Sequence, residues 1–350
     1  MSNALIESGL FGNLFRDRDV AELFGAGPLL GKMLRFEGAW TNALMTCGRV
    51  SDADAAAALA ALAHFDAGAF VAATDKDGVP VPALIAALRE GLAAGPAQAI
   101  HTGATSQDVV DTALVLTYLD VLAMLEARLD RVIAALRKLD TVHGARPLMA
   151  RTRMQAALPA EVSLRVGAWV RLVQAQRDRT HDLRRDLAVV QVGGPIGQRG
   201  ADGASDDLAR LVATELGLRL TDVWHADRSV MVGLGHWLSL VTGALGKIGQ
   251  DVALMAQQGI DEISLSGGGG SSAMPHKQNP VLAETLVAIA RYVAGQQGIL
   301  AQAMVHEQER SGAAWALEWL TLPAMAEATG AALRHCETLA GQITRIGAAE

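Results

Sequence analysis

Apolar residues recur along this chain three and four positions apart, which is the pattern of helices that bury one face. The stretch from Leu29 to Val50 shows this spacing first. Longer stretches follow, and they predict long helices over about 105–143, 159–192, 227–263 and 280–309. No alternation of apolar and polar residues is long enough to build a sheet. Four or five antiparallel helices of this length predict an all-α fold, a long-helix bundle of the up-and-down kind.

Three local signals predict where these helices begin. Thr105 and Asp108 have the spacing of a capping box, in which two side chains pair with unpaired amides at a helix start. Pro159 suits the first turn of the second long helix, because proline lacks an N–H that this turn would leave unpaired. Asn279 and Pro280 suit the N-cap and first position of the fourth long helix.

The character of the chain changes after Gly95-Pro96, where short helical stretches give way to long ones. There is no repeat period and no long linker. We therefore expect an N-terminal helical domain over 1–98, a central long-helix bundle over 99–335 and a short C-terminal segment over 336–350.

The composition is unusually apolar for a soluble chain. Hydrophobic residues make up 51% of it and charged residues 19%, against roughly 25% charged in an average protein. Either a membrane or extensive subunit contact must cover the surplus. The best candidate for a membrane span, Ser229 to Gly246, contains His236 and four glycines, and Lys247 follows at once. These features favour a buried bundle helix over a membrane span.

Several classes of function are disfavoured. The net charge of −7 argues against general affinity for nucleic acid. The N-terminus lacks a basic leader before an apolar core, and the two cysteines, Cys47 and Cys336, lie far apart, so we expect a cytoplasmic protein without disulfides. The nine histidines show no metal-ligand spacing, and no dinucleotide fingerprint follows a strand, so we expect neither a metal nor a cofactor.

The most informative segment is SLSGGGGSSAMPHKQNP, residues 264–280. Its four consecutive glycines are typical of a mobile loop, and the spacing of a Walker phosphate-binding loop is absent. Residues 270–280 fit the pattern Gly-Ser-Ser-x-Met-Pro-x-Lys-x-Asn-Pro at every specified position. On this match the chain resembles the fumarase/aspartase (argininosuccinase) superfamily. Two further regions are similar to the same superfamily, HTGATSQDVVDTA at 101–113 and ARTRMQAALP at 150–159.

One position within the region at 150–159 departs from the superfamily pattern. Most members have histidine where this chain has Arg153. That histidine helps to protonate alcohol or amine leaving groups, whereas a carboxylate, with a pKa near 4, can leave or attack with little acid assistance. The chain most resembles the lactonising branch, the 3-carboxy-cis,cis-muconate cycloisomerases, also through the stretch HEQERSGAAWALEWLTLP at 306–323. That resemblance spans about residues 10–345 and implies that a third, C-terminal domain is missing or reduced.

The resemblance implies roles for residues of the glycine-rich loop. Ser271 would transfer a proton, although Ser272 beside it is an alternative because spacing does not separate the two. Lys277 would stabilise a serine alkoxide or the aci-carboxylate intermediate. Asn279 would contact the substrate as well as cap a helix. The expected substrate-binding residues, carried over in the same way, are His101, Thr105, Ser106, Arg151, Thr152, Arg153, Gln155, Met274 and Arg310.

Several of these residues also have purely structural interpretations. Thr105 and Ser106 suit helix capping as well as carboxylate binding. Arg153 suits either a carboxylate clamp or a salt bridge. His143 suits carbonyl capping better than a proton shuttle. Glu284 either orients groups of the site or is an ordinary acid in a first helical turn.

The resemblance further implies a homotetramer, in which the three regions meet from three different subunits and act on a small polycarboxylate. Such an enzyme would need no cofactor. Two alternatives remain: an adenylosuccinate-type lyase or another elimination enzyme of the superfamily, and a structural relative without activity. The missing histidine disfavours the first alternative, and the intact glycine-rich loop disfavours the second.

Overall fold

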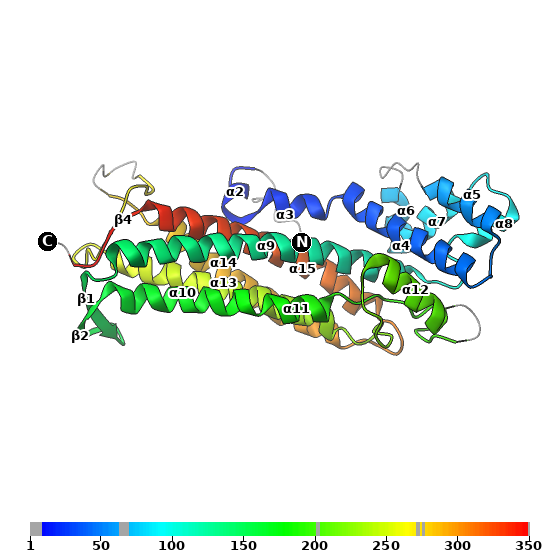
Figure 1. Ribbon diagram of the computed structural model, residues 1–350. Coiled ribbons are helices and arrows are strands. Elements are labelled where there is room, and N and C mark those ends of the chain that lie inside the picture. The colour runs from blue at the N-terminus through cyan, green and yellow to red at the C-terminus, as the bar shows by residue number, and fades with distance from the viewer. Residues whose placement is uncertain (1–8, 63–69, 201–203, 271–273, 275–276, 349–350) are drawn as a thin grey trace.

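The computed structural model describes residues 9–62, 70–200, 204–270, 274 and 277–348. It is an elongated bundle of long helices that lie side by side along one axis (Figure 1). These helices are α9 (Ser106–His143), α10 (Val162–Asp178), α13 (Ser229–Met255), α14 (Val281–Leu300) and α15 (Gly312–Gln342). The predicted all-α long-helix fold is confirmed.

Shorter elements lie around this bundle. One group, which covers one end of it, consists of α4 (Ala26–Thr46), α5 (Asp52–Leu62), α6 (Val71–Asp77), α7 (Val81–Arg89), α8 (Ala94–Ala99) and α12 (Asp206–Leu216). The remaining short helices are α2 (Gly12–Phe15), α3 (Arg18–Leu23), α11 (Thr180–Leu187) and the 3-10 helix η2 (Ala301–Met304). Two short antiparallel strand pairs lie at the opposite end: the hairpin of β1 (Pro147–Thr152) with β2 (Gln155–Glu161), and β3 (Ile263–Leu265) with β4 (Ile343–Ile346).

The helix α9 begins where the capping box predicts. The Asp108 carboxylate accepts a hydrogen bond of 3.1 Å from the Thr105 amide, and helical geometry starts at Ser106. With 38 residues at 1.5 Å per residue, the helix is about 57 Å long. Its buried positions include Val115, Leu122 and Leu129, which contribute to one continuous core. The helix therefore connects the two ends of the molecule.

The candidate membrane span of the sequence lies within α13, which is the one described helix long and apolar enough to cross a membrane. Within its most apolar window, 56% of the helix is buried in the bundle. Two glycines explain how closely it packs on α14. A Cβ on Gly249 would lie 2.4 Å from the Ala283 carbonyl oxygen, and one on Gly246 would lie 2.5 Å from the Ala290 Cβ. This packing supports the interpretation of α13 as a core helix.

The expectation of no sheet, and of a helix that begins near Pro159, is wrong. Pro159 lies in β2 opposite Met149, and helical geometry begins only at Val162. The hairpin forms because Arg153 and Met154, with φ of 48° and 67°, make a tight two-residue turn between β1 and β2. Alternation this short is hard to distinguish from a helical turn in a sequence.

Other predicted helix ends are also displaced. The helix α13 ends at Met255, and β3 begins at Ile263, where the sequence pattern continues the helix. Asn279 is not the N-cap of α14, because its amide and carbonyl pair with Gly269 and Pro280 takes the N-cap position. The helix α14 itself ends at Leu300 and not near residue 309. The expected boundary between residues 335 and 336 falls inside α15, which continues to Gln342.

Candidate functional site

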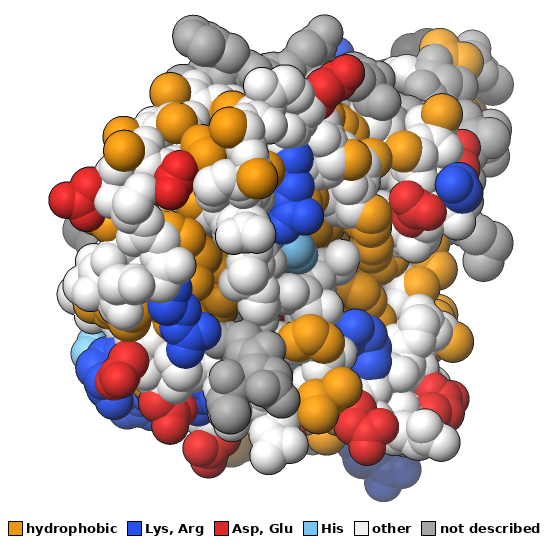
Figure 2. All heavy atoms as spheres, turned by 90° about the vertical axis from the view of Figure 1, so that its right-hand side faces the viewer, with side chains coloured by type: hydrophobic (Ala, Val, Ile, Leu, Met, Phe, Trp, Pro, Cys, Tyr) orange, Lys and Arg blue, Asp and Glu red, His pale blue; other side chains and the backbone are white. Residues whose placement is uncertain are grey.

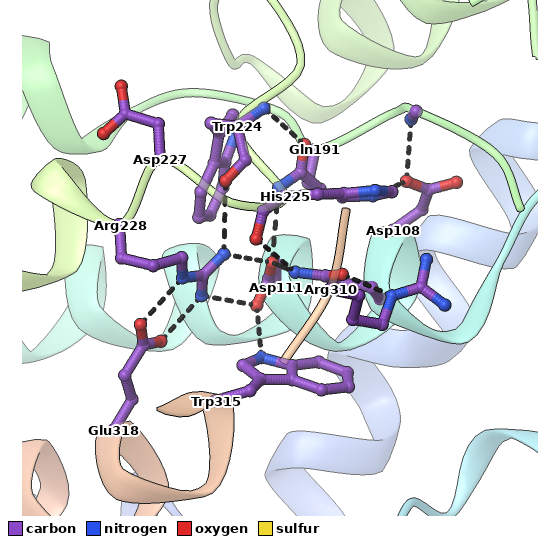
Figure 3. Close-up of polar contacts among 12 residues, drawn as sticks. Asp108, Asp111, Gln191, Trp224, His225, Asp227, Arg228, Arg310, Trp315 and Glu318 are labelled. Atoms are coloured by element: carbon purple, nitrogen blue, oxygen red, sulfur yellow. Dashed lines mark hydrogen bonds and ion pairs between the residues drawn. The ribbon is translucent and has the colours of Figure 1, made fainter. Parts of the chain in front are cut away.

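Numbered in chain order, the three motif regions are residues 101–113, 150–159 and the glycine-rich loop at 264–280. The start of α9 carries the first of them. Asp108 is fully buried there, and its carboxylate accepts hydrogen bonds from the amides of Gly193 (2.8 Å) and Gly194 (3.0 Å) (Figure 3). The His225 Nε2 lies 2.9 Å from the same carboxylate. Asp108 therefore ties the start of α9 to the 193–194 turn and to the segment before α13. Thr105 and Ser106 are half-buried at this helix start.

Arg310 is brought to the same place from the segment before α15. Its Nε donates a hydrogen bond of 2.7 Å to Gln107 Oε1, next to Ser106 in the chain (Figure 3). The side-chain amide of Gln107 in turn donates to the His225 carbonyl at 2.9 Å. The structure thus brings Arg310 to the residue that follows Ser106, although the two predicted residues are about 200 positions apart in the sequence.

His101 precedes α9 and has an unusual backbone. Its φ is 60°, in the left-handed region that residues with a side chain rarely adopt. Its ring Nδ1 lies 2.7 Å from Oε1 of Glu37, a fully buried carboxylate on α4. Backbone strain of this kind concentrates at functional sites.

A buried ion cluster forms around Asp111, close to the start of α9. The Arg228 guanidinium, with no exposed surface, donates to Asp111 at 2.7 and 3.0 Å and to Glu318 at 2.7 and 2.6 Å. Trp315 Nε1 donates to Asp111 at 2.9 Å. Figure 3 shows that these residues come from α9, the start of α13 and α15, so the cluster fastens together the helices around the first region.

The two carboxyls of the cluster titrate differently. Burial raises the pKa of Glu318 to about 7, because the opposing hydrogen bonds and charge of Arg228 do not offset the loss of hydration. Burial acts on Asp111 in the same direction, but the charge and hydrogen bonds of Arg228, with those of Gln191 and Trp315, outweigh it and lower its pKa. Asp111 is therefore the permanent counter-ion of Arg228.

The second motif region forms the β1–β2 hairpin. Arg151 Nη1 donates to Glu262 at 2.5 Å, so this guanidinium already has a carboxylate partner within the chain. Arg153, at the tip, is exposed and makes no ion pair with the residues that the structure describes. Thr152 and Gln155, the paired residues that flank the turn, are exposed as well. The hairpin thus presents polar side chains to its surroundings, among them the guanidinium of Arg153, which pairs with no carboxylate of the described part of the chain.

The third region is the glycine-rich loop. A short antiparallel backbone pairing, called the neck below, joins its two ends at Gly269 and Asn279. Gly269 and Asn279 exchange two backbone hydrogen bonds of 2.9 Å each. A Cβ on Gly269 would lie 2.5 Å from Val281 Cγ2, so the close approach requires glycine. Before the neck, the Ser266 amide donates to the Gln342 carbonyl, which fastens the loop to the end of α15.

In the sequence, the serine expected to transfer the proton follows Gly270. Ser271 and Ser272 fall outside the described residues. Lys277 is exposed, and its amide donates to the Met274 carbonyl at 3.0 Å, while the Met274 side chain is 42% exposed. Glu284 is exposed in the first turn of α14.

His143 closes α9 at the hairpin end. It is buried, and its Nδ1 has no hydrogen-bond partner among the described residues, so the expected carbonyl cap is not made through this nitrogen. Burial and the nearby charge of Arg146 lower its pKa. The lowered pKa favours the neutral imidazole at this position.

The three regions lie at two different ends of the molecule. The second and third regions lie at the end of the molecule that holds β1 to β4. There, the ion pair of Arg151 with Glu262 joins the hairpin to the segment that leads into β3. The first region lies at the far end of α9, a helix about 57 Å long. Figure 2 shows that far end, where Lys and Arg side chains and a histidine lie around the middle of the face. One chain therefore does not bring all three regions to one substrate.

The sequence pattern did not identify most of the residues that support the site, and it assigned Asp108 only to a capping box. Glu37, Gln107, Asp108, Asp111 and Arg228 are buried polar residues with partners far away in the chain. The signal that could have found them is a charged or amide side chain on the apolar face of a helix, since such a group needs a partner when buried. No group of three or more potential metal ligands exists among the residues with described positions.

Comparison with known proteins adds independent findings. Residues 21–295 match a protein family described as lyase. The 3-carboxy-cis,cis-muconate cycloisomerase of Acinetobacter baylyi is 32% identical over 94% of this chain and 75% of its own length. Nitrosuccinate lyase of Streptomyces davaonensis is 34% identical over 97% and 75%. The crystal structure of the 3-carboxy-cis,cis-muconate lactonizing enzyme of Pseudomonas putida superposes with a TM-score of 0.86 at 33% identity and covers 96% of this chain and 77% of that one.

Proposed function

Because the chain belongs to the lyase family, which matches its residues 21–295, we propose that it is a cycloisomerase that needs no cofactor. In this proposal it converts 3-carboxy-cis,cis-muconate to a carboxymuconolactone in the cytoplasm, as a step in the degradation of protocatechuate and related aromatic compounds. The named activity of similar proteins from Acinetobacter baylyi and Pseudomonas putida supports this assignment.

The reaction has two steps. A lone pair of one substrate carboxylate forms a C–O bond to the conjugated diene, and the π electrons move onto another carboxylate to give an aci-carboxylate. A proton then binds the carbon beside that group, so the net change consumes one proton. We assign the proton transfer to Ser271, with Ser272 as the alternative, and the stabilisation of the aci-carboxylate to Lys277 and Asn279.

The observation that carries the proposal is Arg153 at the exposed hairpin tip. A lactonising enzyme must bind three carboxylates and has no need to protonate a poor leaving group. A guanidinium binds a carboxylate through two parallel hydrogen bonds, and Arg153 has no ion-pair partner among the described residues that would compete. Arg310, from the segment before α15, lies near the start of α9. It would bind another carboxylate there, together with Thr105 and Ser106 at the helix terminus.

We further propose that the active unit is a homotetramer in which each site takes the three regions from three subunits. Their separation along α9 supports this, because a monomer holds them at opposite ends. Large apolar side chains on the outside of the bundle also support it, among them Leu164 (57% exposed), Tyr292 (46%) and Leu320 (55%). Exposed apolar side chains on long helices are what a subunit interface would cover.

The decisive experiment is to add purified protein to 3-carboxy-cis,cis-muconate without any cofactor and follow the ultraviolet absorbance of the conjugated diene. We expect the absorbance to fall, and Ser271→Ala to abolish the fall while the oligomer stays intact by size-exclusion chromatography. Absence of turnover by the wild-type protein would overturn the proposal. Near-normal turnover by S271A would leave lactonisation in place but assign the proton to another group.

A second candidate is the elimination of nitrite from nitrosuccinate. The similarity to the Streptomyces davaonensis enzyme favours it, and Arg153 is compatible with it because nitrite, like a carboxylate, leaves without a strong acid. The same protein is therefore assayed for nitrite release from nitrosuccinate. Release of nitrite without loss of the muconate absorbance would replace the first proposal by the second.

A further inference from the structure

A row of side chains on one face of α4 holds the loop that precedes α9. Trp40 Nε1 donates to the Thr102 carbonyl at 3.0 Å, and the Thr41 hydroxyl donates to the Ala99 carbonyl at 2.9 Å. Glu37, one helical turn earlier, contacts His101. Positions 37, 40 and 41 share a face of the helix by their spacing. The loop of the first motif region is thus fixed by a scaffold helix at three points.

Two of these contacts are hydrogen bonds to backbone carbonyls, but the third meets an imidazole. The Glu37 Oε1 lies 2.7 Å from His101 Nδ1, while the side chain of His101 is 15% exposed and that of Glu37 is not exposed at all. A carboxylate accepts hydrogen bonds, so the proton of this bond belongs to Nδ1. His101 Nε2 is then the ring atom left for other partners, and it makes no hydrogen bond to the described residues.

The other oxygen of Glu37 is unusual. Oε2 is buried and has no hydrogen-bond partner among the described residues. Burial of a carboxylate that is only half satisfied is unfavourable, and a neutral side chain of similar size would fill the same space at less energetic cost. A merely structural role for position 37 does not explain this arrangement. The left-handed φ of His101 is a second strained feature at the same contact.

We propose that Glu37 is a positioning residue for His101. It holds the proton on Nδ1 and fixes the ring plane, so that Nε2 faces the substrate beside Ser106 and Arg310. Hydrogen bonds of this kind set the tautomer and orientation of functional histidines, and at metal sites their removal lowers affinity or activity about 10–100-fold. The inference deepens the proposed function and rests on it, since the substrate is the polycarboxylate of that reaction.

The test compares Glu37→Gln with Thr41→Val. E37Q keeps the size of the side chain but lets an amide N–H face the ring, so that the Nδ1–H tautomer is no longer fixed. T41V removes a buried hydrogen bond to the same loop without contact to His101, so it reports on loosening of the loop alone. We expect kcat/KM for 3-carboxy-cis,cis-muconate to fall about 10–100-fold in E37Q and to change less than about threefold in T41V. Equal losses in both variants, or near-normal E37Q, would overturn the proposal.

A spectroscopic measurement keeps this result separate from the identity of the reaction. In protein labelled with ¹⁵N-histidine, the His101 signals are identified by comparison with a His101→Gln variant. We expect the Nδ1–H tautomer in the neutral ring of the wild-type protein and a mixture of tautomers in E37Q. A wild-type Nε2–H tautomer would refute the proposal without any assay. If wild-type protein does not convert the muconate, the proposed function fails, and the tautomer alone decides the role of Glu37.

Discussion

Replacing Arg228 by methionine removes the guanidinium from the buried cluster and leaves two carboxyls without it. Arg228 has no exposed surface and makes two hydrogen bonds to Asp111 and two to Glu318, at 2.6 to 3.0 Å. Methionine is similar in length and apolar, so packing changes little. The perturbation is therefore mainly the loss of four charge-assisted hydrogen bonds and of the charge that the carboxyls face.

The expected destabilisation is large and depends on pH. Breaking a buried ion pair by removing one partner lowers the free energy of unfolding by about 3–5 kcal/mol. Without Arg228 the pKa values of Asp111 and Glu318 both lie above those of the unfolded chain, because burial is no longer opposed by a cation. The folded variant then binds more protons than the unfolded chain, so its stability falls as pH rises. We expect the loss to be largest at pH 8 and smaller at pH 5.5.

The assay is urea unfolding followed by circular dichroism at one fixed protomer concentration, because subunit association also contributes to apparent stability. Arg131→Met is the matched control, since it removes an exposed ion pair to Glu337 in which the two side chains are 52% and 38% exposed. Such a pair contributes about 0–1 kcal/mol. The reasoning is refuted if R228M and R131M lose equal stability, or if the loss in R228M is the same at both pH values.

Three more predictions concern single side chains. Burial raises the pKa of Glu318 to about 7, so its contribution to stability decreases as pH rises from about 4.5 to 7. Glu318→Gln should therefore flatten the stability–pH curve in this range. An unchanged slope would show that other groups cause the pH dependence. Gly269→Val should lower turnover more than tenfold with little change in melting temperature, since its Cβ would lie 2.5 Å from Val281. Gly200→Ala is the control, because no atom of the described residues lies within 4 Å of the added Cβ; normal activity in G269V would show that the Gly269–Asn279 pairing tolerates distortion. Arg153→Ala should raise KM while leaving the melting temperature unchanged, compared with Met154→Ala at the same hairpin tip; an unchanged KM would remove Arg153 from the site.

Several features of this protein follow from short stretches of sequence. The start of α9 depends on Thr105 and Asp108, which are three residues apart, and the structure confirms it. The long helices follow from apolar spacing over a few turns, and their existence was predicted more accurately than their ends. The superfamily resemblance depends on contiguous motifs, and the family match bears it out. Local capping and periodicity act within a few residues, so the sequence displays them directly.

The hairpin at 147–161 and the environment of the site depended on the tertiary structure. Pro159 suits a helix start locally, but the turn at Arg153 and Met154 places it in β2. Glu37 meets His101 across 64 positions and Asp108 meets His225 across 117, and periodicity carries no information about such partners. The separation of the motif regions depends on the direction in which α9 runs through the bundle. The sequence alone thus predicted which residues carry the chemistry, and packing decided which of them one chain can bring together, because buried polar groups find their partners only when distant helices meet.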